Sequence, residues 1–181
     1  MLRTVYKLSI LYLFFCCCIC CSPNLYKGVA IIDRQLEWSD FIGKVDPKSE
    51  FSAMTYYNVI YNYYNVRFQN NRVFFDFTVT PVFGQGSWVR GDSKNDYELL
   101  MHEQGHYNIA KAFARDLRKH FYNNRFSRNN YNQQIENVFS QLNIKYEALQ
   151  KQYDSETNHC LNKKMQSTWE KKIKQLMADN L

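Results

Sequence analysis

Cysteine is nearly absent from the body of this chain. Five of the six cysteines lie between positions 16 and 21, and only Cys160 follows them. A protein processed after residue 21 could therefore form no internal disulfide. The sequence also lacks internal repeats and low-complexity linkers. Its 181 residues are enough for one domain but too few for a two-lobed protease.

No run of charge of one sign stands out in the sequence. The formal net charge is +6 and the pI is near 8.9, but Lys and Arg are scattered and alternate with Asp and Glu along the expected helices. This pattern is typical of solvated helix faces. We therefore expect no nucleic-acid partner, and we expect a monomer.

The first 21 residues have the pattern of an export signal. Arg3 and Lys7 form a basic start, and the apolar stretch over residues 8–21 is too short to span a bilayer comfortably. The cysteines at its end resemble a bacterial lipoprotein processing site. We predict a protein that is exported to the periplasm or cell envelope, either free or with a lipid anchor in the membrane. Residues 22–35 would then be a linker, and residues 36–181 one domain.

The first half of this domain predicts strands. Between residues 73 and 80 apolar and polar side chains alternate, as in a half-buried strand. Residues 55–68 are rich in Tyr, Val and Ile, and the turn-like residues 69–71 separate the two stretches. The pair therefore predicts an antiparallel hairpin. Residues 87–90, which lie between glycines, are expected to form a short edge strand.

Three helices are expected after the strands. The first runs from about residue 94 to 123, with Asp92 or Ser93 as its N-cap. The second carries an apolar stripe over residues 135–153, and the third begins near Cys160. Strands followed by helices predict an α+β fold, in which a small antiparallel sheet precedes a motif helix and two further helices.

An H-E-x-x-H motif occupies residues 102–106 of the first expected helix. His102 and His106 share one helix face, so both imidazoles can bind a single zinc ion. Glu103 would lie beside the metal, where it can take a proton from bound water whose pKa zinc lowers to about 7. Gly105, which costs about 1 kcal/mol relative to Ala in a helix, indicates a close approach of backbone or substrate. The motif predicts metal-assisted hydrolysis with one zinc ion as cofactor.

A third zinc ligand is needed, because a catalytic site has three protein ligands and an open position. His120 lies too far along the helix, at about 21 Å from His106. We predict His159, since it follows the second helical stripe at a break in the pattern. Asp154 and Glu156 are alternatives that offer oxygen, and those that do not bind directly could orient a ligand. The thiol of the adjacent Cys160 is a further alternative.

Several stretches of the chain resemble an uncharacterised bacterial family of predicted secreted zinc-dependent proteases. The stretches are residues 38–41, 87–90, 99–110 and 153–159, in the order of that family, and the resemblance spans about residues 36 to 175. It implies a zincin-like pair of helices and favours histidine 159 as a ligand. The family favours Gly after that histidine, where this chain has Cys160.

The leading hypothesis is a zinc metallopeptidase in which Glu103 is the general base. A peptide or protein substrate would pair with the edge strand at residues 87–90. Tyr107, Tyr153 or Arg90 could stabilise the oxyanion, and Trp88 could contact substrate.

Two other functions use the same residues. One is a non-catalytic envelope protein with a structural zinc site, which would have no use for a base at Glu103. The other is a zinc hydrolase that acts on a non-peptide polymer of the envelope.

Overall fold

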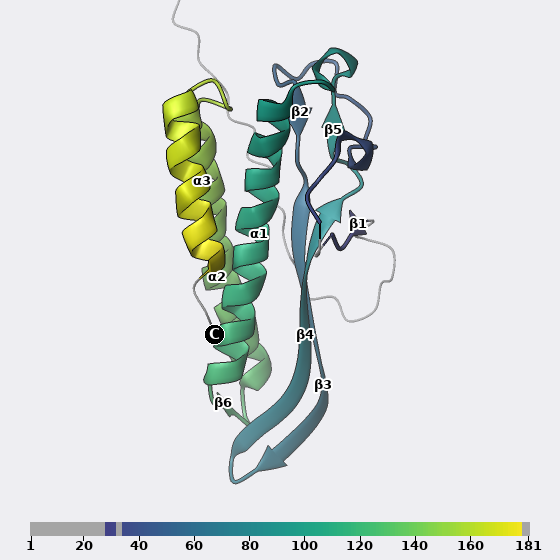
Figure 1. Cartoon of the computed structure of the whole chain (residues 1–181). Helices are drawn as coiled ribbons and strands as arrows, with labels where there is room; N and C mark the ends of the chain where they lie inside the picture. Colours follow the sequence, from purple (N-terminus) through teal and green to yellow (C-terminus); the bar gives the residue numbers. More distant parts are fainter. Residues whose placement is uncertain (1–27, 32–33, 179–181) are drawn as a thin grey trace, which may run out of the picture.

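The computed structural model describes residues 28–31 and 34–178, so the predicted export signal and its cysteines lie outside the described part. The fold is α+β, as predicted (Figure 1). Its elements are, in order, β1 (Gly28–Val29), the 3₁₀ helix η1 (Trp38–Asp40), β2 (Ala53–Met54), β3 (Tyr57–Gln69), β4 (Arg72–Gly84), β5 (Trp88–Val89), the 3₁₀ helix η2 (Gly91–Ser93), α1 (Tyr97–Asn123), β6 (Phe126–Ser127), α2 (Tyr131–Thr157) and α3 (Lys163–Ala178).

The predicted hairpin is confirmed as the antiparallel pair of β3 and β4. Asn70 and Asn71 join the strands with φ angles of 46° and 61°. A two-residue turn with both central residues in the left-handed region matches the twist of the strands, and Asn tolerates that region better than most residues.

A bulge interrupts the hairpin before its turn. The register of β3 against β4 shifts between Tyr64 and Arg67. Asn65 has a φ of 52° there, and its side-chain amide donates to Asp76 at 2.8 Å. Arg67 forms an ion pair with the same carboxylate at 3.2 Å. The bulge increases the local twist, so the end of the hairpin is turned relative to its base.

Two short strands extend the sheet on the edge of β4 opposite β3. β1 pairs with Phe83 and Gly84, and β6 pairs with Arg72 and Val73. Residues 28–29, within the stretch predicted as a linker, are thus part of the sheet. The expected short strand at residues 87–90 corresponds to β5, which pairs with β2 in a separate two-stranded sheet.

The N-cap of α1 differs from the prediction. Asp96 is the cap, and its carboxylate accepts from the backbone N–H of Leu99 at 3.0 Å. Asp92 and Ser93 instead lie in η2, a separate turn that precedes the helix. Asp92, Ser93 and Asp96 are all residue types that favour the N-cap, so the sequence alone could not distinguish between them.

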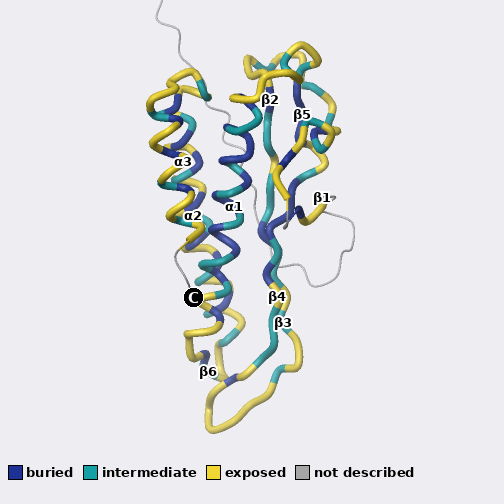
Figure 2. Tube along the Cα trace, in the orientation of Figure 1, coloured by how far each residue is buried: buried dark blue, intermediate teal, exposed yellow. Residues whose placement is uncertain are grey.

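The three helices cover one face of the hairpin, with α1 between the hairpin and the other two helices (Figure 1). Buried positions concentrate along α1 and on the strand faces turned toward it, whereas the hairpin end is exposed (Figure 2). The larger core cluster lies between the hairpin and the helices, and comprises Val59, Val73, Val79, Ile109, Ala112, Phe113, Ala114, Leu117, Phe121, Phe126, Ile135, Phe139, Leu142, Tyr146, Tyr153, Trp169 and Ile173.

Asp116 links α1 to α2 beside this core. Its carboxylate accepts from Tyr146 Oη at 2.7 Å and from Lys145 Nζ at 3.0 Å. Burial alone would raise the pKa of Asp116, but these two hydrogen bonds and the lysine charge hold the pKa below its usual value.

Within the described residues, no helix combines the length and the apolar character needed to cross a bilayer.

Candidate metal centre

The candidate metal centre lies where the ends of three helices meet. The motif residues 102–106 follow the first turn of α1, Asp154 lies in the last turn of α2, and Gln166 lies in the first turn of α3. These ends come together because α2 runs antiparallel to both α1 and α3 (Figure 1). The two motif histidines point from α1 toward the other two helices.

Three imidazoles surround one carboxylate oxygen in this cluster. Nε2 of His102 and Nε2 of His106 are 3.2 Å apart. Oδ1 of Asp154 lies 3.2 Å from His102 Nε2, 2.9 Å from His106 Nε2 and 3.4 Å from His159 Nδ1. Donor atoms of His102, Asp154 and His159 all lie within 4.8 Å of one another. The cluster contains both motif histidines, the predicted His159 and the alternative Asp154.

The spacing of these atoms fits a small tetrahedral cation. Two donors at roughly 2.0–2.1 Å from a tetrahedral zinc ion are about 3.3 Å apart. The four separations given above run from 2.9 to 3.4 Å. Imidazole nitrogens with a carboxylate oxygen are also a common zinc donor set. These residues could therefore hold a divalent metal.

Two glutamines set the orientation of the motif histidines. Nδ1 of His102 lies 3.1 Å from Gln166 Oε1, and Nδ1 of His106 lies 2.6 Å from Gln150 Oε1. The Gln150 amide group also donates to His106 O at 2.9 Å, which turns its oxygen toward the ring. Each Nδ1–H therefore donates to an amide oxygen, and each Nε2 is directed toward the centre of the cluster.

Sequence reasoning missed both glutamines. Gln150 and Gln166 are only 8% and 7% exposed. Each occupies a position in an otherwise apolar helical stripe, and a polar residue in such a stripe was the available signal. Which histidine each one meets depends on the packing of helices that are distant in the sequence.

Tyr153 holds α2 against the motif. Its ring stacks on His102 with centroids 4.6 Å apart, and its hydroxyl donates to His102 O at 3.2 Å. A Cβ added at Gly105 would lie only 2.4 Å from this hydroxyl oxygen. Gly105 is therefore required by a side chain of α2, so the predicted close approach exists, but the partner is Tyr153 rather than backbone or substrate. Because Tyr153 is fully buried and its hydroxyl is engaged, the structure gives it a packing role rather than the predicted oxyanion contact.

The cluster has the charge that a divalent cation requires. Burial alone would lower the pKa of His106, but the hydrogen bond and charge of Asp154, with the charge of Glu103, raise it to about 9. Burial disfavours ionised Asp154, yet hydrogen bonds to the three histidines hold its pKa well below its usual range. A divalent ion would displace the proton that this raised pKa keeps on His106 at neutral pH, and the charge of the two carboxylates would then match that of the ion.

Glu103 lies beside the cluster without a partner of its own. The residue is 4% exposed, and its charge acts on both His106 and Tyr153. Among the described residues, no group donates a hydrogen bond to its carboxylate. Its backbone oxygen accepts from Thr55 Oγ1 at 3.5 Å. A buried carboxylate without a bound donor can accept a proton from a group that enters the site.

His159 lies on an unusual segment of backbone. Asn158, His159 and Cys160 have φ angles of 48°, 49° and 66°, all in the left-handed region. The segment reverses the chain after α2 and directs His159 back toward Asp154. Left-handed backbone favours Gly, which accounts for the preference of the resembling family for Gly at the position of Cys160. The Cys160 side chain packs against the smaller apolar cluster.

A loop before β2 supports the ring of His159. Phe51 packs on this imidazole with ring centroids 4.6 Å apart. Arg90 donates from Nε to Phe51 O at 2.9 Å, and its Nη2 donates to Ser49 O. The predicted oxyanion role of Arg90 is therefore replaced by an indirect one, in which Arg90 fixes the loop and the loop carries Phe51 to His159.

Three other predicted site residues lie away from the cluster. Tyr107 is fully buried; its hydroxyl accepts from the Ile31 N–H and donates to Pro81 O, so it is not placed to stabilise the oxyanion as predicted. Trp88 is only 3% exposed, which removes it as a substrate contact. Glu156 accepts from Trp169 Nε1 at 2.8 Å, and it is not among the residues whose donor atoms gather in the cluster.

Of the two short strands β2 and β5, it is β2 rather than the predicted segment 87–90 that lies beside the motif helix. Arg90 N–H donates to Ser52 O at 2.8 Å, so the backbone N–H and C=O groups of the even-numbered residues in and next to β2 point toward β5. The backbone groups of Ala53 and Thr55 then point to the opposite edge. The Thr55 side chain contacts Glu103 O, which places the end of β2 beside the motif helix. Among the described residues, no other strand pairs with it.

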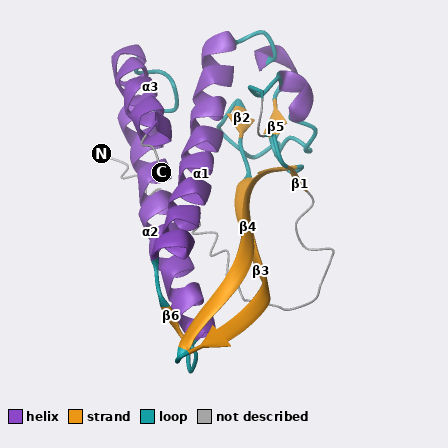
Figure 3. Cartoon of the chain, turned by 60° about the horizontal axis from the view of Figure 1, so that its bottom comes forward, coloured by secondary structure: helices purple, strands orange, loops and turns teal. Residues whose placement is uncertain are grey.

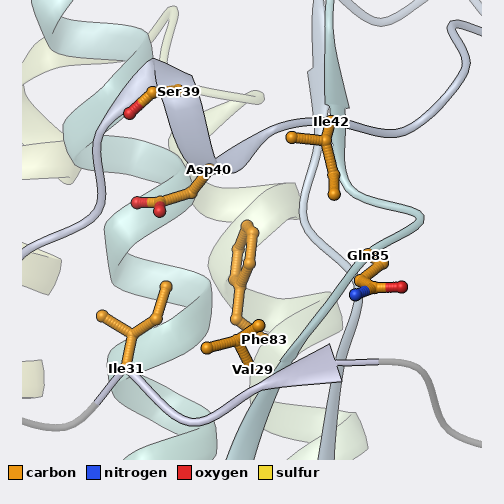
Figure 4. A pocket seen from close by; sticks show the side chains of 7 residues that line it. All are labelled: Val29, Ile31, Ser39, Asp40, Ile42, Phe83 and Gln85. Carbon is orange, nitrogen blue, oxygen red and sulfur yellow. The ribbon is translucent and has the colours of Figure 1, made fainter.

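A shallow cleft of about 150 Å³ lies elsewhere, between β1, η1 and the end of β4 (Figure 4). Its lining is mainly apolar, and its single charged side chain, Asp40, is paired with Arg34. The cleft shares no residue with the histidine cluster.

The fold and the cluster define a class, an α+β domain with a motif helix whose two histidines meet donors from a second helix. The chain belongs to the family described as "Bacterial protein of unknown function (DUF922)", which matches residues 32–160. The matched residues include every histidine and carboxylate of the cluster. The comparison with curated proteins gives no match, and neither does the comparison with solved structures.

Proposed function

We propose that this protein is a zinc-dependent peptidase. The observation that carries the proposal is the convergence of His102 Nε2 and His106 Nε2 with Asp154 Oδ1, while Glu103 lies unpaired beside them. His102, His106 and His159 would hold the ion, together with or in exchange for Asp154. Bound there, zinc would supply Lewis acidity, which polarises a carbonyl and makes a coordinated water more acidic.

Glu103 is the general base in this proposal. Glu103 follows His102 directly on α1. Among the described residues, no hydrogen-bond donor occupies its carboxylate oxygens, so they are available to accept a proton. It would take the proton of the attacking water and return it to the leaving amine. Gln150 and Gln166 keep both histidine rings in the tautomer that directs Nε2 inward.

The free edge of β2 is the proposed docking position for the substrate. An extended peptide that pairs with Ala53 and Thr55 would run between this strand and the motif helix, close to Glu103. Backbone pairing of this kind accepts many side chains, so we expect broad specificity for unfolded segments rather than for one sequence.

A structural zinc site is the second candidate, and one observation favours it. His102, His106, Asp154 and His159 offer four donors, which would fill a tetrahedral site and leave no open position. In that case Glu103 would have no role in the function of the protein.

The experiment compares Glu103→Gln with the wild-type chain. Zinc content is measured first, and peptide-library cleavage is measured next. We expect one zinc ion in both proteins and a loss of about 10² to 10⁴ in cleavage rate for the variant, since Gln cannot accept the proton. Glu136→Gln, an exposed change on α2, is the matched control and should cleave like wild type.

Two outcomes would contradict the peptidase proposal. Equal cleavage by wild type and Glu103→Gln would exclude Glu103 as the base. Full zinc occupancy in a His102→Ala, His106→Ala double variant would show that the metal binds elsewhere. Zinc binding without cleavage by either form would favour the structural site.

We also propose that the chain is exported and acts in the cell envelope, on the basis of its first 21 residues. Mass spectrometry of the protein from cells would show removal of this segment, and a lipid on Cys21 would establish an anchor. A cytosolic protein that retains the segment would contradict export.

A further inference from the structure

A second surface of interest lies at the far end of the hairpin from the histidine cluster. We define the hairpin tip as residues 67–74 together with residues 125–128, which β6 brings beside the turn (Figure 3). Arg128 N–H donates to Asn71 O at 3.1 Å and so fixes the two segments to each other. The tip contains four arginines and no acidic residue.

The fold creates this concentration of charge, because the arginines come from two distant parts of the sequence. Arg67 is paired with Asp76 just outside the tip. Arg72, Arg125 and Arg128 are exposed, and among the described residues none of them forms an ion pair. These three residues place three positive charges at one end of a chain whose formal net charge is +6.

Aromatic side chains are exposed between the arginines. Phe68 is 46% exposed and Phe74 is 45% exposed, whereas most large apolar residues of the fold are buried. In the register of the hairpin, Phe74 lies opposite Arg67 and Phe68 lies opposite Val73. These two cross-strand pairs point to opposite faces of the strands, so the tip carries a phenylalanine on each face. The guanidinium of Arg128 lies 5.0 Å from the Phe68 ring.

We infer that the hairpin tip binds the surface of a membrane that contains anionic phospholipids. The arginines match the phosphate headgroups, and the phenylalanines can enter the boundary between headgroups and acyl chains. A projecting hairpin with an aromatic ring on each face suits shallow insertion. A nucleic acid or another polyanion would use the charge, but two rings on opposite faces cannot stack along one strand.

The test places a fluorescent reporter at the tip of the full chain. Phe74→Trp adds an indole at an exposed position, and its spectrum is taken as the difference from wild type. Vesicles of phosphatidylcholine alone are compared with vesicles that also contain phosphatidylglycerol, each with and without brominated lipid. Ile144→Trp, at a 66% exposed position on α2, is the matched control reporter.

We expect a blue shift and strong bromolipid quenching of Trp at position 74 in the anionic vesicles only, and both should be lost at high salt. Each arginine near the surface contributes about fivefold to the binding constant. Arg72→Gln with Arg128→Gln should therefore weaken binding of the tip by about 25-fold, while the melting temperature stays unchanged because both side chains are exposed.

Three results would overturn the inference. Equal quenching of the position 74 reporter in neutral and anionic vesicles would show that the arginines do not recognise anionic headgroups. Equal quenching of the reporters at positions 74 and 144 would show that the tip is not the docking surface. A spectral shift at position 74 with single-stranded nucleic acid or heparin, but not with anionic vesicles, would identify a polyanion as the partner.

Discussion

Replacement of Gly105 by Ala tests the packing of α2 on the motif helix. Inside a helix this change normally stabilises a protein by about 1 kcal/mol, because Ala has the higher helix propensity. Here the new methyl carbon would lie 2.4 Å from Tyr153 Oη and 2.8 Å from Tyr153 Cζ. The ring must move, and overpacking of this kind costs about 1–3 kcal/mol.

The two effects leave a net destabilisation of about 1 kcal/mol, or a decrease in Tm of about 2–4 °C for a chain of this size. Zinc affinity should fall more clearly, by about 10- to 100-fold, because displacement of Tyr153 also disturbs His102, on which it stacks. Thermal melts and zinc titration with a chromophoric chelator measure both quantities.

Two further variants make the test specific. Gly91→Ala meets no atom within 4 Å and is the matched control, with a Tm equal to wild type or slightly higher. Tyr153→Phe removes the atom closest to the new methyl group, so in the Gly105→Ala background it should recover part of the lost stability. A Gly105→Ala protein with raised Tm and unchanged zinc affinity would refute this packing of α2.

Three other expectations follow from contacts near the site and the core. Phe51→Ala should weaken zinc binding about tenfold, and the effect should disappear in a His159→Ala background if Phe51 acts only through that ring. Cys160→Gly should raise the free energy of unfolding by up to about 1 kcal/mol, because it relieves left-handed strain but loses some packing; an equal or lower value would contradict strain at this position. Asp116→Asn should lower stability at neutral pH. Since the folded pKa of Asp116 is depressed, its contribution is present above its unfolded pKa near 4 and is lost as pH falls through the folded value, so urea midpoints of wild type and variant should converge in acid.

The long elements of the fold were predictable because their periodicity is local. The hairpin repeats every two residues and the helices every 3.6, so β3, β4 and α1 could be placed within a few residues. The strands β1, β2 and β6 have two residues each and carry no such pattern. β1 and β6 form because they pair with the edge of β4, and β2 forms because it pairs with β5; each pairing is a property of the tertiary structure.

The site was predictable to the extent that it is encoded in one helix. His102 and Glu103 are fixed by spacing within the motif, whereas the choice between Asp154 and His159 required the end of α2 in three dimensions. The structure brings Asp154 to the motif histidines and His159 to Asp154. Tyr107 was misassigned because its neighbours in the sequence line the site, although one helical step turns its side chain toward Ile31 and Pro81.

The distance along the chain between the donors bears on the order of folding. His102 and Asp154 are 52 residues apart, and they meet only after two helices of 27 residues each have paired. A cation that needs both cannot bind before that late, long-range contact exists. Its binding energy would then be absent from the early folding barrier and present in the native state, so it would slow the unfolding rate while it leaves the folding rate nearly unchanged. Metal binding would therefore be a late event in folding, and its main effect on this domain would be kinetic stability against unfolding.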